Sequence, residues 1–405
     1  MNPRRCVLRA LIATALALTV SAGLPGAGRA QEPIKIGLVQ GLTGAFEVYA
    51  RQVVDGFRLG LEYGTQGTHE VLGRKIQVIV EDDQLKPDVA KRLVTKLYAD
   101  DKVDLVVGTT SSAAALAVLP VAAEFKKLIV VEPAVADSIT GEHWNRYVFR
   151  TGRNSGQDAI ANALAVARPG VVIATIAQDY AFGRDGVAAY KAAVEKLGGK
   201  VVHEEYTPVQ ATDFTAPIQR IIGALKDRPG QKYVFVIWAG KGGPFPQLVA
   251  SRLDRYGIAL TSGGNVLDVL KAMKAMGLEG MVGGLYYYYE IPKNPVNDWL
   301  VREHQRRFNT PPDFFTCGGF SAAMAVLTGL RRAGSTDTEK LIAAMEGMEF
   351  DTPKGKMIFR KEDHQALQAM YAFRMTAKPD VPWLVPVLTR ELSPQQTAPP
   401  ILNMR

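Results

Sequence analysis

The stretch VVGTTSSAAALAVL (106–119) contains, in order, an apolar strand, a glycine, four consecutive hydroxyl residues and an alanine-rich run with helical spacing. A glycine between a strand and a helix permits a tight turn, and a serine at the start of a helix caps its first N–H groups. Those N–H groups and the helix dipole also favour an anion. Three interpretations are open from this loop alone: a nucleophilic serine, a simple helix cap, or a cradle for a negatively charged ligand.

Short apolar strands alternate with amphipathic helices on both sides of this stretch. The first set of strands is IKIGLVQ (34–40), KIQVIVED (75–82), VDLVVG (103–108) and LIVVEP (128–133). After Arg150 the pattern begins again, with VVIATIAQ (171–178), KVVHEEY (200–206) and KYVFVIW (232–238). Nearly continuous apolar strands are typical of a parallel sheet covered on both faces. The sequence therefore predicts an α/β protein with two doubly wound, Rossmann-like lobes.

A third stretch from Tyr286 onward predicts long helices near 294–308 and 314–333 and two late strands near 356–360 and 368–375. These strands are too few for a sheet of their own, so we expect them to complete the two lobes. The four tyrosines of GLYYYYEIP (284–292) are expected to alternate between the faces of a strand.

The boundaries between the lobes are expected in turn-rich segments. Crossings are predicted at TGR (151–153), in the GLYYYYEIPKNP segment (284–295) and near Gln368. The predicted division is a leader at 1–30, a first lobe of 31–150 plus 287–367, and a second lobe of 151–286 plus 368–405.

The first thirty residues have the organisation of a secretory signal peptide, with arginines, an apolar run and small residues before a cleavage site at Gln31. Loss of the four leader arginines lowers the formal net charge from +8 to +4. Such a mild balance predicts no nucleic-acid partner. Cys6 is far from the cleavage site, so no lipid anchor is expected. The leader predicts an exported protein that is soluble once the leader is removed.

Catalysis has little support in the sequence. Five histidines are scattered in polar or strand-edge contexts, and no G-x-S-x-G surrounds Ser111 or Ser112. The motifs H-E-x-x-H, C-x-x-C and G-x-x-x-x-G-K-[ST] do not occur. We therefore expect no catalytic residue, no metal and no cofactor. Cys317, the cysteine outside the leader, is expected to be a small buried hydrophobe.

A second loop, EPAVADSITG (132–141), follows its strand as the opening loop does. Together with other stretches it resembles the periplasmic substrate-binding proteins of ABC importers, of the leucine/isoleucine/valine-binding type. The matching stretches are IKIGLVQGLTGAFEVYARQVVDGFRLGLEY (34–63), VVGTTSSAAALAVLPVAAEFKKLIVVEPAVADSIT (106–140), YVFRTG (147–152) and QDYAFGRDGVAAYKAAVEKLGGKVV (178–202). The resemblance covers about residues 32–390. It implies a type I periplasmic binding fold, in which two lobes joined by a three-strand hinge close over a ligand like a Venus flytrap.

The resemblance also implies a set of ligand-binding residues. They are Ser111, Ser112, Ala134, Ala136, Tyr49, Phe182, Trp238, Gly264 and Phe315. Ser112 would hold a carboxylate through its hydroxyl and N–H, and Ala134 and Ala136 would contribute backbone groups. Aromatic residues of the set would form walls, although ordinary core packing is an equal alternative for each of them.

The chain departs from amino-acid binders where they hold the ligand's ammonium group. Ala136 stands where they have a threonine, and LTSGGNVLD (260–268) offers glycines and Asn265 in place of an acid. An ammonium buried without a counter-charge is costly. Asp137, Asp179 or Asp268 could supply the missing charge. The ligand is therefore expected to be either a hydrophobic amino acid or a non-amino acid such as an aromatic or keto acid.

Import is the function that these features favour: a monomeric periplasmic receptor that captures a small carboxylate-bearing solute and delivers it to an inner-membrane ABC permease. One alternative is a sensory binding module that presents its ligand to a regulatory partner. Another is a periplasmic hydrolase, which is disfavoured because no base is placed near Ser111 or Ser112.

Overall fold

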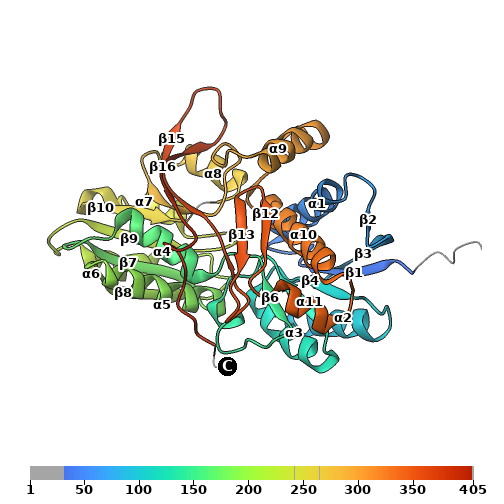
Figure 1. Cartoon of the computed structure of the whole chain (residues 1–405). Coiled ribbons are helices and arrows are strands. Elements are labelled where there is room, and N and C mark those ends of the chain that lie inside the picture. The colour runs from blue at the N-terminus through green and yellow to red at the C-terminus, as the bar shows by residue number, and fades with distance from the viewer. Residues whose placement is uncertain (1–31, 241, 264, 404–405) are drawn as a thin grey trace, which may run out of the picture. The chain divides into compact units, whose positions relative to one another are not determined.

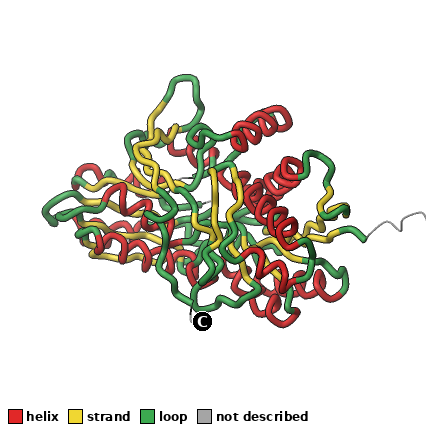
Figure 2. The backbone as a smooth tube through the Cα atoms, viewed as in Figure 1, coloured by secondary structure: helices red, strands yellow, loops and turns green. Residues whose placement is uncertain are grey.

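The computed structural model of the chain describes residues 32–240, 242–263 and 265–403. The predicted leader at 1–30 and Gly264 lie outside the described residues. From Pro33 onward the described chain contains a six-stranded sheet, a seven-stranded sheet and a small three-stranded sheet (Figures 1 and 2). Helices and strands alternate through the first two sheets, as the sequence predicts.

The six-stranded sheet forms the centre of the first lobe. Its order is β2-β3-β1-β4-β5-β6, and its pairings are parallel except for the β2–β3 hairpin. The strands are β1 (Ile34–Gln40), β2 (Glu70–Val71), β3 (Arg74–Asp82), β4 (Leu105–Gly108), β5 (Leu128–Val131) and β6 (Val148–Arg150). Leu105 and Val107 of β4 enter one hydrophobic cluster, whereas Val106 enters another. This sheet is therefore covered on both faces.

The helices of the first lobe come from both ends of the chain. They are α1 (Glu47–Gly64), α2 (Pro87–Ala99), α3 (Ser112–Phe125), α9 (Pro295–Phe308), α10 (Phe314–Ala333) and α11 (Thr338–Met345). The α1 and α10 helices cover one face of the sheet and α2 and α3 cover the other. The chain thus returns to its first lobe after building the second.

The seven-stranded sheet forms the centre of the second lobe, with the order β16-β15-β11-β10-β9-β7-β8. Its strands are β7 (Val172–Gln178), β8 (Lys200–Thr207), β9 (Lys232–Ile237), β10 (Ile258–Ser262), β11 (Val282–Leu285), β15 (Met370–Ala377) and β16 (Leu384–Leu392). Strands β7 to β11 are parallel to one another, and β15 and β16 are antiparallel additions at one edge. Its helices are α4 (Ser155–Val166), α5 (Ala181–Lys196), α6 (Thr215–Leu225), α7 (Phe245–Ala250) and α8 (Leu267–Ala275).

Two expectations for the third stretch are wrong. Strands β12 (Glu349–Thr352), β13 (Gly355–Phe359) and β14 (Ala366–Leu367) form a small antiparallel sheet, although no separate sheet was expected here. The tyrosines 286–289 follow β11 rather than lie in a strand. Tyr287 is buried and its hydroxyl donates to Asn297 Oδ1 at 2.7 Å. Burial among aromatic neighbours, not strand alternation, accounts for this segment.

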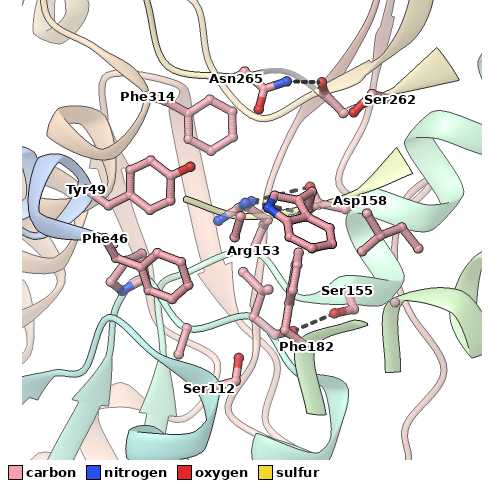
Figure 3. A pocket seen from close by; sticks show the side chains of 18 of the residues that line it. Phe46, Tyr49, Ser112, Arg153, Ser155, Asp158, Phe182, Ser262, Asn265 and Phe314 are labelled. Carbon is pink, nitrogen blue, oxygen red and sulfur yellow. Dashed lines mark hydrogen bonds and ion pairs between the residues drawn. The ribbon is translucent and has the colours of Figure 1, made fainter. Parts of the chain in front are cut away.

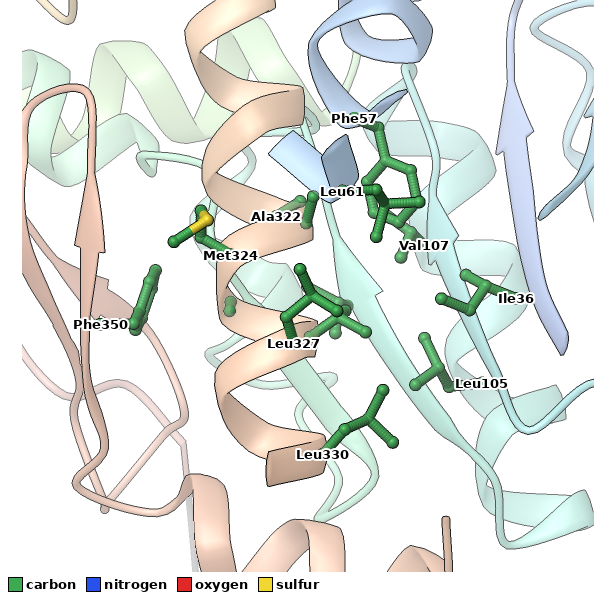
Figure 4. Close-up of a cluster of buried hydrophobic side chains, with 14 of the residues drawn as sticks. Ile36, Phe57, Leu61, Leu105, Val107, Ala322, Met324, Leu327, Leu330 and Phe350 are labelled. Carbon is green, nitrogen blue, oxygen red and sulfur yellow. The ribbon is translucent and has the colours of Figure 1, made fainter. Parts of the chain in front are cut away.

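Close packing of α1 against α10 builds the core of the first lobe (Figure 4). A Cβ added at Gly56 of α1 would lie 2.0 Å from the Thr316 carbonyl, and one at Gly319 of α10 would lie 2.0 Å from the Val53 carbonyl. Only glycine lets the two backbones approach this closely. Helix α10 is long and apolar enough to cross a membrane, but 89% of its apolar window is buried within the protein. This burial is that of a core helix.

The arrangement of strands brings two sets of loops together. In the first sheet the chain adds β3 on one side of β1 and β4 on the other, so the strand order reverses between β1 and β4. In the second sheet it reverses in the same way between β7 and β9. Ligands of open α/β sheets bind at such reversal points, beyond the carboxyl ends of the strands. The loops after these four strands are therefore the place to look for a site.

Candidate functional site

The loop after β4 leads into the first turn of α3, where the opening stretch of the sequence lies. A Cβ added at Gly108 would lie 2.2 Å from the Val39 carbonyl, so this position requires glycine. Ser111 is the N-cap residue of α3, but its side chain makes no capping hydrogen bond. The first intrahelical bond runs from Ala115 N–H to the Ser111 carbonyl. The N–H groups of the turn before it have no acceptor within the helix, as at every helix start, and remain available to an anion.

Ser112 presents a hydroxyl beside those N–H groups. Its Oγ accepts a hydrogen bond from Ala136 N–H at 3.2 Å, which leaves the hydroxyl proton available to a ligand. Thr110, by contrast, already donates to Gln40 Oε1 at 2.7 Å. The start of α3 thus offers several donors and carries no acidic side chain in its first turn.

A cavity of about 120 Å³ lies over this helix start, between loops of the two lobes (Figure 3). Its walls are strongly aromatic. The aromatic lining residues are Phe46, Tyr49, Tyr180, Phe182, Phe235, Trp238, Phe314 and Phe315. Tyr49 stacks on Phe46 with ring centroids 5.7 Å apart and packs against Phe315 in a tilted arrangement with centroids 4.4 Å apart. An engineered apolar cavity of about 150 Å³ in another protein holds benzene, so the space suits one ring or a side chain of similar size.

Tyr49 also links the two lobes. Its hydroxyl oxygen accepts a hydrogen bond from Gly240 N–H at 2.9 Å. Tyr49 comes from α1 of the first lobe, and Gly240 from the loop after β9 of the second lobe. Burial raises the pKa of Tyr49, so its hydroxyl keeps its proton at neutral pH.

One charged pair enters the cavity wall. Nε of Arg153 lies 3.3 Å from Oδ1 and 3.2 Å from Oδ2 of Asp158. The Arg153 guanidinium also lies over the Phe314 ring, 4.8 Å from its centroid. Burial raises the pKa of Asp158, while the nearby Arg153 acts in the opposite direction. The carboxylate of Asp158 is therefore already paired.

The polar groups of the wall are mostly donors. Trp238 Nε1 is buried and has no hydrogen-bond partner among the residues that the structure describes. In the Arg153 guanidinium, Nε bonds to Asp158, and the other two nitrogens have no hydrogen bond to the residues that the structure describes. The hydroxyls of Ser155 and Ser262 are used by the carbonyls of Val135 and Val236. The cavity is thus suited to an anionic ligand with a flat or apolar body.

The structure brings six of the nine residues expected from the sequence to this cavity. They are Tyr49, Ser112, Ala134, Phe182, Trp238 and Phe315. Ser111 and Ala136 are buried and lie behind the wall. Ala136 has no free backbone group, because its N–H donates to Ser112 and its carbonyl accepts from Arg150 at 2.6 Å. Its N–H orients the Ser112 hydroxyl, and a backbone contact of Ala136 with a ligand stays a prediction. Gly264 is outside the described residues.

The three acids that were expected to supply a counter-charge lie outside the cavity wall. Asp137 accepts from Gly156 N–H at 2.9 Å, Asp179 pairs with Arg184, and Asp268 lies in the first turn of α8. None of these three lines the cavity. The acid in the wall is Asp158, which sequence reasoning missed.

Other lining residues were missed for understandable reasons. Arg153 lies in TGRNSG, which reads only as a turn, and Asp158 sits one helical turn later on α4. Their spacing of five is compatible with pairing across a helix start, which was the available signal. Phe314 directly precedes Phe315, and Phe46 lies three residues before Tyr49 at the start of α1. No sequence pattern distinguishes either of them from a core residue.

Two doubly wound lobes with a ligand-sized cavity between their reversal points define a class of protein, the two-lobed solute receptors. The chain belongs to the periplasmic binding protein family, whose model matches residues 33–380.

Relatives and solved structures agree with this assignment. The chain is 27% identical over 357 residues to Leu/Ile/Val-binding protein homolog 6 of Brucella abortus, covering 86% of this chain and 88% of that protein. It is 61% identical to an ABC-type branched-chain amino acid transporter from Rhodopseudomonas palustris, with a TM-score of 0.83 and coverage of 92% of this chain and 100% of that one. It is 30% identical to a solute-binding protein of an ABC transporter from R. palustris in complex with 3,4-dihydroxybenzoic acid, with a TM-score of 0.77 and coverage of 89% and 97%.

Proposed function

We propose that this protein is the periplasmic receptor of an ABC importer and that it captures a compact aromatic or keto carboxylate. The observation that carries the proposal is the start of α3, where the first-turn N–H groups and the Ser112 hydroxyl face a cavity enclosed by aromatic rings. A carboxylate would bind those donors, and the ring or branched body of the ligand would fill the aromatic space.

The charges of the wall favour an acid without an amino group. A buried ammonium needs a carboxylate partner, and Asp158 in the wall is paired with Arg153. The N–H groups of Arg153 that are not used by Asp158 would face a second oxygen of the ligand instead, such as a keto or phenolic oxygen. A hydrophobic amino acid is the second candidate, and Asp158 is the residue that would have to turn to its ammonium.

The relatives support both candidates. The protein that is 61% identical is described as a branched-chain amino acid transporter, and the one that is 30% identical was crystallised with a dihydroxybenzoic acid. The donor-rich wall of this chain is the reason to place the acid without an amino group first.

A matched pair of ligands tests the choice. Leucine and 4-methyl-2-oxopentanoate have the same carbon skeleton and differ only in an amino or keto group, and benzoate and 3,4-dihydroxybenzoate add the ring. At a hundredfold excess over Kd a ligand stabilises its receptor by about 2.7 kcal/mol, which a thermal-shift assay detects readily. We expect the keto or aromatic acids to raise the melting temperature more than leucine. If leucine is the better ligand, the second candidate is correct, and if none binds, the carboxylate proposal fails.

The partners and location follow from the same proposal. A soluble receptor of this family would be exported by its leader, act as a monomer in the periplasm and present its closed form to a membrane permease. The relatives described as ABC transporter components favour import over a sensory role. Uptake of the labelled ligand into cells, compared with a strain lacking the receptor, tests this step.

A further inference from the structure

Asp313, outside the cavity wall, is at first sight an ordinary helix cap. It is the N-cap residue of α10, and its Oδ1 accepts from Phe314 N–H at 2.8 Å. Its own N–H donates to Thr316 Oγ1 at 3.4 Å, which completes a capping box. These bonds lie within the first lobe and would persist however the two lobes are arranged.

The same carboxylate also bonds the second lobe. Leu267 N–H, the first of helix α8, lies 3.2 Å from Oδ1 and 3.0 Å from Oδ2 of Asp313. Gln52 of α1 donates to Oδ2 at 2.8 Å and accepts from Phe315 N–H at 3.2 Å, which fixes the carboxylate in place. One side chain is therefore held by two elements of the first lobe and by one of the second.

Helix α8 has no side-chain cap of its own. Its N-cap residue is Val266, which has no side-chain acceptor, so the acceptor for Leu267 N–H comes from the other lobe. Two helix starts, of α8 and of α10, thus converge on one negative charge, an arrangement that their dipoles favour. When the lobes separate, α10 keeps its cap, but the Leu267 N–H of α8 loses its bond to Asp313 and bonds to water instead.

We propose that Asp313 is a closure latch, a positioning residue that stabilises the ligand-bound arrangement of the two lobes by capping a helix of the opposite lobe. The latch consists of Asp313, the N–H of Leu267 and the supporting amide of Gln52. It rests on the proposed function only in that a ligand is expected to bind between the lobes. Because apparent affinity scales with the population of the closed form, a weaker latch weakens binding without any contact to the ligand.

Leu267 allows a selective test because the bond uses its backbone. The variant Leu267→Pro removes the N–H at the first position of the helix, where proline is well tolerated. Val266 before it has φ −64° and ψ 156°, an extended conformation compatible with a following proline. The matched control Leu267→Ala keeps the N–H and loses a comparable amount of side-chain packing. Both variants leave the capping box of α10 intact.

We expect Leu267→Pro to bind the ligand about tenfold more weakly than Leu267→Ala, since hydrogen bonds to charged groups are among the stronger ones in proteins. Asp313→Ala, which removes both carboxylate oxygens that accept from Leu267 N–H, should weaken binding in the same direction. Asp337→Ala is its control: Asp337 caps α11 through Lys340 N–H, and no hydrogen bond joins its side chain to the second lobe among the described residues. It should leave affinity unchanged. Equal affinity of Leu267→Pro and Leu267→Ala would overturn the latch.

A measurement without ligand separates this inference from the proposed function. Small-angle scattering of the ligand-free variants reports how far the lobes separate. We expect Leu267→Pro to have a larger radius of gyration than Leu267→Ala, and equal radii count against the latch. If the wild-type protein binds none of the carboxylates tested, the proposed function fails, and the latch is judged on scattering alone.

Discussion

The starts of α3 and α10 both face the space between the lobes, yet they are built differently. The start of α3 has a serine as N-cap residue with no capping bond, and its first turn carries no acid. The start of α10 is filled by the carboxylate of Asp313, which also reaches α8. A helix start can thus have two functions. Without a side-chain cap it can bind a negative charge from outside the protein, and with a carboxylate cap it can bind another part of the protein.

The largest effect should come from filling the start of α3. The variant Ser112→Asp places a permanent carboxylate where the ligand's acid group is expected, so repulsion and occupied donors should weaken binding by more than about 100-fold. The melting temperature of the ligand-free protein should change little, because acids are favoured in the first helical turn. Calorimetric titration measures the first effect. Thr338→Asp, at the equivalent position of α11, is the control and should bind normally.

If Ser112→Asp bound the ligand as tightly as the wild type, the start of α3 would not be the anion site. The two helix starts would then not differ in their ability to bind an anion from outside the protein.

A milder change at the same position should have a smaller effect. Ser112→Ala removes the hydroxyl donor to the ligand and the acceptor of Ala136 N–H. We expect affinity to fall by about 10- to 100-fold, the range for a hydrogen bond to a charged group, and the free energy of unfolding to fall by about 1–3 kcal/mol because a buried N–H loses its partner. Chemical denaturation and titration measure the two effects separately. A loss of stability with full affinity would make Ser112 a structural residue only.

The sequence was sufficient for the longer elements because they carry their signal locally. Apolar runs place β1 at 34–40 and α10 at 314–333 with the bounds that the structure has. Short strands such as β6 and β11 were missed, since three or four residues carry no usable periodicity. Their place in the sheets is decided by neighbouring strands.

The candidate site was predictable where it depends on one loop and not where it depends on two. Ser112 follows a strand at a reversal point, so the fold indicates its position, and the family resemblance implied the position of Tyr49. The Arg153–Asp158 pair lies in a turn with no distinctive sequence pattern. The Asp313–Leu267 bond joins segments that are far apart in the chain. Such contacts exist only after the lobes are assembled, and a single sequence does not show them.

Asp313 should also make ligand binding depend on pH, whereas the start of α3 has no titratable side chain in its first turn. Burial raises the pKa of Asp313 from 3.8 to about 6, and its N–H donors only partly offset this. Separated lobes would expose the carboxylate and return its pKa toward the ordinary value, so closure takes up a proton. Affinity should therefore rise as pH falls from 7 to 5, by up to about tenfold.

Titrations at several pH values check this prediction, with ligands whose own carboxylate stays ionised. Asp313→Asn should flatten the profile in this window. A profile equally steep in the variant would assign the dependence to another group, such as Glu132, whose burial raises its pKa to about 7.

The smallest effect is expected at the second bond between the lobes. Tyr49→Phe removes the acceptor of Gly240 N–H while keeping the ring that packs against Phe315. This bond joins neutral groups, which contribute less than bonds to a charge, so we expect affinity to fall only about threefold, less than in Leu267→Pro. Tyr63→Phe, on the same helix but packed against Trp299 away from the cavity, is the control. An effect of Tyr49→Phe larger than that of Leu267→Pro would mean that Tyr49, rather than the filled helix start of α10, holds the lobes together.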